Sequence, residues 1–246
     1  MRVESSHKSG APLRLAAACA FLAAALLAFS PAVRADDDDR DRQGEVDRVA
    51  AATTAFGEVM DVPERAIPSA VLTKAEGVAV FPAVKKGGFV VGGQWGRGIL
   101  SVRGARGTWS SPAFLTLTGG SFGLQIGGQE IDLILVIMDR KGLERLVRNQ
   151  FKIGVDAGVA AGPVGRDAQA ATDIQMRAKI LSYSRARGLF AGVTINGGTI
   201  KQDRDANRRF YGRSYSTSEI VFERLGGAPP PVSGWREALN RFAAGN

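Results

Sequence analysis

Residues 77–103 read GVAVFPAVKKGGFVVGGQWGRGILSVR, short β-branched and aromatic runs separated by glycine and proline. Runs of this kind are typical of β-strands, and the glycines and the proline mark turns or bulges. We expect strands at 77–81, 87–95 and 98–103. The sequence KKGG at 85–88 is a turn signal. It predicts that the first two strands form a hairpin.

Outside this stretch, strands occur in groups rather than in strict alternation with helices. We expect further strands at 113–118, 121–128 and 131–139 (a buried central strand), and two more within 180–200. Helices are expected at 45–60, 64–74, 139–150, 204–212 and 217–225, and a last one is expected to begin at Ser233. Residues 152–165 are expected to form a strand or a loop, and residues 167–178 a helix or a segment that loops out of the domain. This grouping predicts a single α+β domain. Its core should be a twisted, largely antiparallel, Gly-rich sheet, or a barrel-like one, with flanking helices.

The first 35 residues have the features of a secretory signal peptide. Arg2, Lys8 and Arg14 flank an apolar run at 15–29, and small residues precede a cleavage site after Ala35. The run is shorter than the roughly 20 residues of a membrane span. We therefore expect an exported protein, located in the periplasm or at an envelope membrane surface. Lipoprotein anchoring through Cys19 is the less favoured alternative.

Export would remove the chain's only histidine, His7, and its only cysteine, Cys19. The motif GGSFG at 119–123 fits the G-x-S-x-G pattern of lipases. A nucleophilic serine needs an adjacent base, usually histidine. Ser121 is therefore predicted to be part of a Gly-rich strand pair and not a nucleophile. Without histidine and cysteine, ordinary zinc or copper sites and disulfides are excluded, and we predict no metal and no cofactor.

Charge divides the chain into an acidic leader and a basic body. The chain has 246 residues and a formal net charge of +8. Residues 36–47, DDDDRDRQGEVD, hold seven acids and two arginines. Such a run predicts a solvated, disordered segment. The expected organisation is a signal peptide at 1–35, an acidic leader at 36–44, a folded domain at 45–225, and a Pro-rich linker with a C-terminal helix at 226–246.

Basic side chains on the first strands are the main candidate site. Cations combined with tryptophan suit anionic lipid head groups; a solvated strand face is the equal alternative. Export and a content of only 7% aromatic residues argue against nucleic acid. The residues concerned are Lys85, Lys86, Arg97, Arg103 and Arg106, with Trp95 and Trp109.

Two other arrangements remain as alternatives. Glu130 and Asp132 share one face of a strand, and with Asp156 they could serve a hydrolase of envelope glycans; a structural, hydrogen-bonded Asp132 is favoured. The helix at 45–60 has an apolar stripe that could lie on a membrane, but packing against the core is favoured because its polar face is not rich in Lys or Arg.

Four stretches together resemble the SYLF domain. They are 65–103, 109–139 (WSSPAFLTLTGGSFGLQIGGQEIDLILVIMD), 154–172 (GVDAGVAAGPVGRDAQAAT) and 182–198 (SYSRARGLFAGVTINGG). The resemblance covers about 45–225 in the family's order. It implies a lipid-binding module of bacterial exported proteins, whose eukaryotic relatives bind phosphoinositides and, in fungi, actin. Those two ligands are not expected in a bacterial periplasm.

The resemblance also implies where lipid would bind. The family's ligand contact is basic surface residues together with an N-terminal amphipathic helix, and no enzymatic activity is associated with it. We therefore predict non-enzymatic, peripheral binding of anionic lipid at an envelope membrane, by either the helix at 45–60 or the hairpin at 81–97. An adaptor that binds an acidic protein partner is the other alternative. The positions matching the family's basic residues are Lys85, Lys86, Arg97, Arg185 and Arg187.

Overall fold

The computed structural model describes residues 32–64, 66–88, 91–122, 129–148, 150–165, 178–186, 189–192, 197–223 and 231–243. The chain divides into two units, 1–41 and 42–246. The second unit holds the sheet and the helices that cover it. The predicted signal peptide and Cys19 lie outside the described residues.

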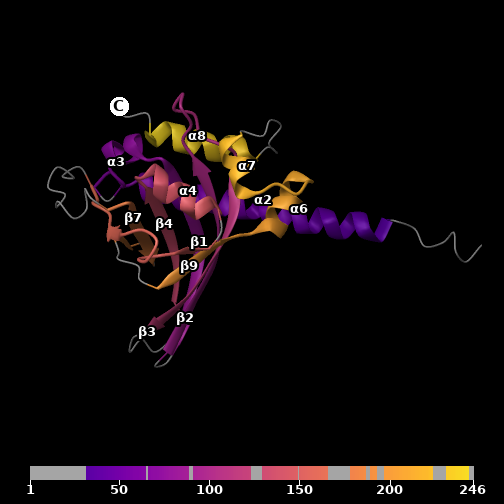
Figure 1. Ribbon diagram of the computed structural model, residues 1–246, viewed down its shortest axis with the longest axis horizontal. Coiled ribbons are helices and arrows are strands. Elements are labelled where there is room, and N and C mark those ends of the chain that lie inside the picture. Colours follow the sequence, from indigo (N-terminus) through magenta and orange to yellow (C-terminus); the bar gives the residue numbers. More distant parts are fainter. Residues whose placement is uncertain are drawn as a thin grey trace, which may run out of the picture. The chain divides into compact units, whose positions relative to one another are not determined.

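A nine-stranded sheet forms the centre of the domain (Figure 1). Its order is β5-β9-β3-β2-β1-β4-β7-β6, and β8 also pairs with β7. All pairs are antiparallel except β6 with β7. The predicted α+β class and largely antiparallel sheet are confirmed. The strands are β1 (Gly77–Gly88), β2 (Val91–Val102), β3 (Ala113–Phe122), β4 (Gln129–Ile137), β5 (Phe151–Lys152), β6 (Val159–Ala161), β7 (Ile180–Ala186), β8 (Leu189–Gly192) and β9 (Gly198–Gln202).

Three of the helices begin at residues suited to that position. Asp203 caps α6 by accepting a hydrogen bond from the Ala206 amide, and Ser216 with Glu219 forms a capping box on α7. Pro231 opens α8, where its missing N–H costs nothing. The helices are α2 (Ala32–Met60), α3 (Ser69–Lys74), α4 (Arg140–Arg148), α6 (Arg204–Tyr211), α7 (Thr217–Phe222) and α8 (Pro231–Ala243).

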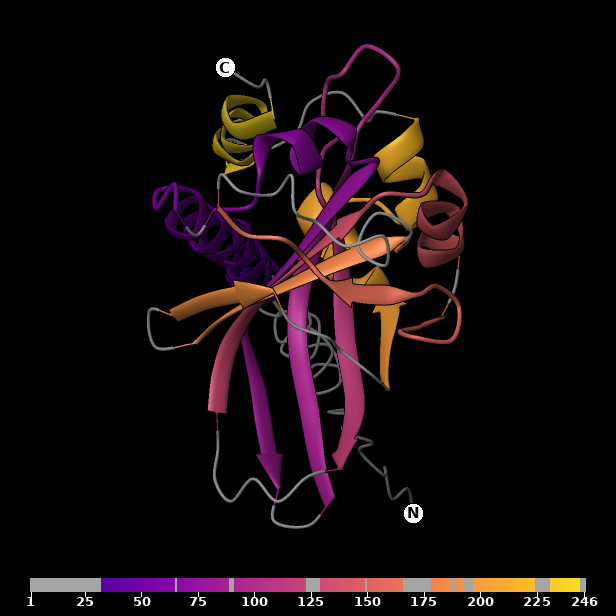
Figure 2. The ribbon, with the colours of Figure 1, turned by 90° about the vertical axis from the view of Figure 1, so that its left-hand side faces the viewer.

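Alternating side chains give the sheet two buried faces. Val78 and Val80 of β1 belong to one cluster with Phe56 of α2 and Trp235 of α8. Phe81 belongs to a second cluster, with residues of α4 and α7. Figure 2 shows α2 and α8 on one side of the sheet and α4 and α7 on the other. The two-residue repeat of a strand thus supplies both cores.

β1 differs from its prediction at the turn. Residues 85–88 continue the strand, paired with 92–95 of β2 and in part with β4, so the turn predicted there is wrong. The irregularity lies earlier, at Pro82 and Ala83, where the register shifts and Ala83 has a φ of 52°. Its amide donates to Asp132 Oδ1. A bulge absorbs Pro82, which cannot donate to the ladder, and the strand then resumes.

Three other boundaries bear on the predicted organisation. β3 is continuous through Ser121, which pairs with Gly92 and lies in a strand as expected; 123–128 fall outside the described residues. Helix α2 begins at Ala32 and so includes the acidic segment 36–44. The compact unit extends past residue 225, because Trp235 and Leu239 of α8 are buried in the first cluster.

Candidate functional site

An exposed tryptophan lies between two cations, in the second half of β1 and the first part of β2. Trp95 is 46% exposed, and the Arg97 guanidinium lies 5.6 Å from the centre of its ring. Lys85 of β1 is the direct cross-strand partner of Trp95. Among the described residues, no carboxylate lies within ion-pairing distance of Lys85 or Arg97. Both cations are therefore available to an external anion.

The alternation of the strands fixes which face this group occupies. A Cβ added at Gly96 would meet Val84, and one at Gly98 would meet Phe81, so these glycines face the second cluster. Trp95 and Arg97 consequently lie on the opposite face, the one that α2 covers elsewhere. Trp95, Arg97 and Lys85 together form a surface that is called the strand face below.

The two predicted lysines do not act together. Lys86 lies on the same side as Val84, since the two are two positions apart on one strand. It is half-buried, and this burial lowers the pKa of its ammonium group. The sequence pattern KK suggested one basic tip, but in an extended strand neighbouring side chains point to opposite faces.

Arg185 is already bound within the protein. Its guanidinium donates to Asp132 Oδ2 from Nε at 3.0 Å and from Nη2 at 2.7 Å, and Nη2 also pairs with Glu58 of α2. This links β7, β4 and α2, and leaves little of Arg185 for a ligand. Arg187 lies outside the described residues. Of the five predicted residues, the structure brings together Lys85 and Arg97.

Arg103 and Trp109 have a structural role as well. Arg103 donates to the carbonyl oxygens of Leu72 and Ala75 at the end of α3, and its guanidinium lies 4.5 Å from the centre of the Trp109 ring. Cations commonly satisfy the last carbonyls of a helix in this way. Trp109 is buried, so it offers nothing to a membrane.

The carboxylates considered for hydrolysis are in separate surroundings. Asp132 accepts from Ala83 N and binds Arg185, which makes it the structural aspartate that the sequence favoured. Asp156 accepts from the Lys152 amide within its own turn. Glu130 is exposed beside Lys85 in the sheet register. Two of the three carboxylates thus have a local structural partner.

The apolar stripe of α2 packs against the sheet, as the sequence analysis favoured. Val49, Phe56, Val59 and Met60 are all buried in the first cluster. Each such side chain contributes on the order of 1.5–3 kcal/mol, an upper estimate, so detaching the helix would cost roughly 6–12 kcal/mol. That is comparable with the whole stability of a domain, about 5–15 kcal/mol. The stripe is therefore not available to a membrane.

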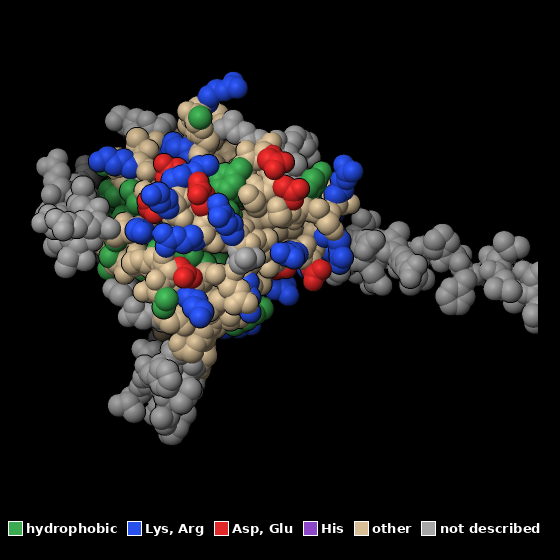
Figure 3. Space-filling view, in the orientation of Figure 1, with side chains coloured by type: hydrophobic (Ala, Val, Ile, Leu, Met, Phe, Trp, Pro, Cys, Tyr) green, Lys and Arg blue, Asp and Glu red, His purple; other side chains and the backbone are tan. Residues whose placement is uncertain are grey.

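A second basic surface was missed by the sequence analysis. On the face that α4 covers, Lys and Arg side chains gather around α4 and β9, interspersed with acids (Figure 3). The run RKGLERLVR at 140–148 signals it, because its leucines fall at helical spacing and its cations on the other side. The exposed cations of α4 and the following strand are Arg140, Lys141, Arg145, Arg148 and Lys152.

Comparison with known proteins identifies the domain. A family profile described as "Ysc84: Las17-binding protein actin regulator" matches residues 118–242, from β3 to the end of α8. The chain belongs to the Ysc84 (SYLF) family. The resemblance seen in the sequence is thereby confirmed, and the match includes the C-terminal helix.

Relatives occur in fungi and mammals. LAS seventeen-binding protein 3 of Saccharomyces cerevisiae is 33% identical over 172 residues, 69% of this chain and 37% of the relative. SH3 domain-containing YSC84-like protein 1 of Rattus norvegicus is 31% identical over 183 residues, 73% of this chain and 53% of the relative. The chain therefore matches only about a third to a half of the length of these relatives. They are named as binding or domain-containing proteins, not as enzymes.

Two further properties concern the described residues only. None of their helices combines the length and the apolar character needed to cross a membrane. They also contain no group of three or more His, Cys, Asp or Glu side chains arranged to hold a metal ion.

Proposed function

We propose that this domain binds anionic phospholipid at an envelope membrane, without catalysis, through the strand face. The observation that carries the proposal is Trp95, nearly half exposed on a sheet and flanked by Arg97 and Lys85. Tryptophan is favoured at membrane interfaces, where its ring sits at head-group level, and cations beside it meet the lipid phosphates.

Charge on this face favours an anionic surface over a neutral one. Lys201 of β9 is exposed on the same side, since it pairs with Thr116, which in turn pairs with Arg97. Glu130 is the acid beside Lys85. With the ion-paired Arg185, Asp132 and Glu58 included, this face has four cations and three acids, an excess of one positive charge. Each cation near an anionic surface contributes on the order of 1 kcal/mol.

The yeast relative's name supports a second candidate. It is called a LAS seventeen-binding protein, so a member of the family is named for a protein partner. An adaptor that binds an acidic protein partner would suit the basic surface around α4, which offers cations without an exposed tryptophan. The two surfaces lie on opposite faces of the sheet. Measuring vesicle binding after charge reversal on each surface in turn therefore distinguishes the two candidates.

Reversing the two charges of the strand face is expected to weaken vesicle binding. Lys85→Glu with Arg97→Glu removes two attractive cations, worth about 2 kcal/mol or roughly thirtyfold in partitioning, and adds repulsion. The measurement is flotation of residues 36–246 with phosphatidylglycerol–phosphatidylcholine vesicles. We expect a loss of thirtyfold or more at 0.05 M salt and a smaller loss at 0.5 M, where the Debye length is below ~10 Å.

The matched control is Lys141→Glu with Arg148→Glu. It changes the same residue types by the same total charge, but on α4. If this control loses as much binding as the strand-face variant, net charge alone governs the interaction and the strand face is not the contact. Trp95→Ala keeps the charge and should weaken binding at both salt concentrations, since it removes the interfacial ring and not a screened attraction.

The envelope location depends on the first 35 residues. If they are a cleaved signal peptide, the exported protein begins at Asp36 and carries no acyl chain. The intact mass of the protein recovered from the envelope fraction tests this directly. A lipid-modified species beginning at Cys19 would replace this proposal with a lipoprotein anchor.

A further inference from the structure

A line of side chains crosses four strands of the sheet at the level of Trp95. Trp95 of β2 pairs with Thr118 of β3, and Thr118 pairs with Thr199 of β9. On its other side Trp95 pairs with Lys85 of β1. Directly opposed residues share a face, and neighbouring strands are about 4.8 Å apart, so the line from β1 to β9 is about 14 Å long. Trp95, Thr118 and Thr199 are called the threonine row below.

The hydroxyl groups of this row are available to a ligand. Leu117 and Ile200, which are adjacent to the two threonines, are buried in the second cluster, so Thr118 and Thr199 face the opposite side. Thr118 is exposed and Thr199 is partly exposed. Among the described residues, neither hydroxyl group has a hydrogen-bond partner. Each can both donate and accept.

Cations lie at both ends of the row and beside it. Lys85 is at the β1 end. Lys201 is exposed at the β9 end, two positions from Thr199 and therefore on the same face. Arg97 lies between them on β2, since its partner Thr116 pairs in turn with Lys201. Within the described part of the chain, no carboxylate forms an ion pair with Lys201.

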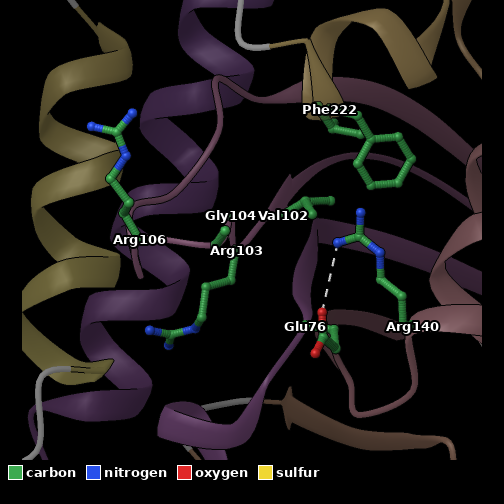
Figure 4. Close-up of a pocket in the computed structure, with 9 residues that line it drawn as sticks. Glu76, Val102, Arg103, Gly104, Arg106, Arg140 and Phe222 are labelled. Atoms are coloured by element: carbon green, nitrogen blue, oxygen red, sulfur yellow. Dashed lines mark ion pairs between the residues drawn. The ribbon is translucent and has the colours of Figure 1, made fainter.

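The pocket at the other end of β2 has no such alignment of side chains. Figure 4 shows Arg103 and Arg106 on one side of it, and Arg140 with Glu76 on the other. Arg103 donates to two carbonyl oxygens of α3, and Arg140 pairs with Glu76. These arginines do not converge on one position for a ligand, whereas the threonine row presents its groups along one line.

We propose that the threonine row binds an extended acidic polysaccharide, with one sugar ring stacked on Trp95. Sugar rings have an apolar C–H face that packs against an aromatic ring, and their hydroxyl groups exchange hydrogen bonds with threonine. Carboxylates of uronic acid residues accept charge-assisted hydrogen bonds from the three cations. Sheet faces bind oligosaccharides in other folds, such as the OB-fold.

Two other extended ligands fit this row less well. Single-stranded nucleic acid is bound by stacking successive bases on successive aromatic rings, whereas this row continues from Trp95 with threonines. An extended peptide adds a strand at the edge of a sheet, whereas this row crosses the inner strands β2, β3 and β9. The inference does not depend on lipid binding, because it rests on the threonine hydroxyls. The two ligands share Trp95 and should compete for it.

Calorimetric titration with a β-1,4-linked mannuronate hexamer tests the proposal. At 0.05 M salt, residues 36–246 should bind it at least tenfold more tightly than cellohexaose, which has the same linkage and no charge. Thr118→Val with Thr199→Val removes both hydroxyl groups but keeps side-chain shape and strand propensity, and should weaken binding at least fivefold. Thr108→Val, on the exposed turn after β2, should change it less than twofold.

The contribution of charge is tested separately. Lys201→Gln should weaken binding of the mannuronate hexamer at least threefold, and Lys141→Gln, an equally exposed lysine on α4, less than twofold. Circular dichroism melting shows whether each variant is folded.

Four results would overturn the proposal. They are no binding of the hexamer up to 10 mM, equal binding of cellohexaose, equal or tighter binding of a thymidine hexanucleotide, and unchanged binding in the folded double threonine variant. Flotation of that variant with anionic vesicles should match the wild type, so the glycan and lipid proposals can fail separately.

Discussion

Replacing Trp235 by alanine is expected to lower the free energy of unfolding by about 3–5 kcal/mol, the range for large-to-small changes of buried aromatic residues. Trp235 is fully buried, its ring packs edge-on against Phe56 at 5.6 Å, and its indole N–H donates to Ser101 Oγ at 2.9 Å. The substitution would leave a cavity between α8, α2 and β2, and it would deprive the Ser101 hydroxyl of a partner.

Urea denaturation followed by far-ultraviolet circular dichroism measures this loss. Arg236→Ala, one position further along α8 and exposed, is the control and should change stability by less than about 0.5 kcal/mol. A cost below 1 kcal/mol for Trp235→Ala would mean that the C-terminal helix is not part of the cooperative domain.

Replacing Arg48 by methionine is expected to cost about 3–5 kcal/mol, because it breaks a buried ion-pair network by removing one member. The Arg48 side chain is only 6% exposed and pairs with Glu45 at 2.8 Å and with Asp203 at 3.0 Å. Glu45, itself 2% exposed, also pairs with Arg209 at 2.6 Å. Without Arg48, carboxylates at this site would be left with unbalanced charge away from water.

Arg208→Met is the comparison for this second substitution. Arg208 is 60% exposed, and among the residues that the structure describes it pairs only with Asp205, so its loss should cost under about 1 kcal/mol. Combining Arg48→Met with Asp203→Asn, which keeps an N-cap for α6, should cost less than the sum of the two single changes. Equal costs for Arg48→Met and Arg208→Met would show that the network does not hold α2 to the domain.

The type of most elements could be predicted from the sequence, because local patterns determine it. The run IDLILVIMD is apolar throughout, and β4 lies between two neighbouring strands. RKGLERLVR has helical spacing and forms α4. The prediction of a turn at 85–88 was wrong. The sequence KKGG is compatible with a turn, but these residues pair with β2 and β4, and this pairing extends the strand.

Much of the candidate site could not be predicted, because it depends on partners distant in sequence. Lys85 and Lys86 are equivalent in a sequence pattern, and only the bulge at Ala83 decides which of them shares a face with Trp95. Arg185 matched the family's basic positions, yet Glu58 and Asp132 bind it from 127 and 53 positions away. No local signal indicates such pairing.

Helix α2 forms its tertiary contacts with segments that are synthesised much later than the helix itself. Arg48 pairs with Asp203, 155 positions away, and Glu45 with Arg209, 164 positions away, while α8 covers the same cluster. Contacts of such sequence separation make folding slow, since long loops must close before they form. During synthesis from the N-terminus, α2 cannot reach its final contacts until residue 209 has emerged. The chain must therefore pass most of its elongation without a finished core.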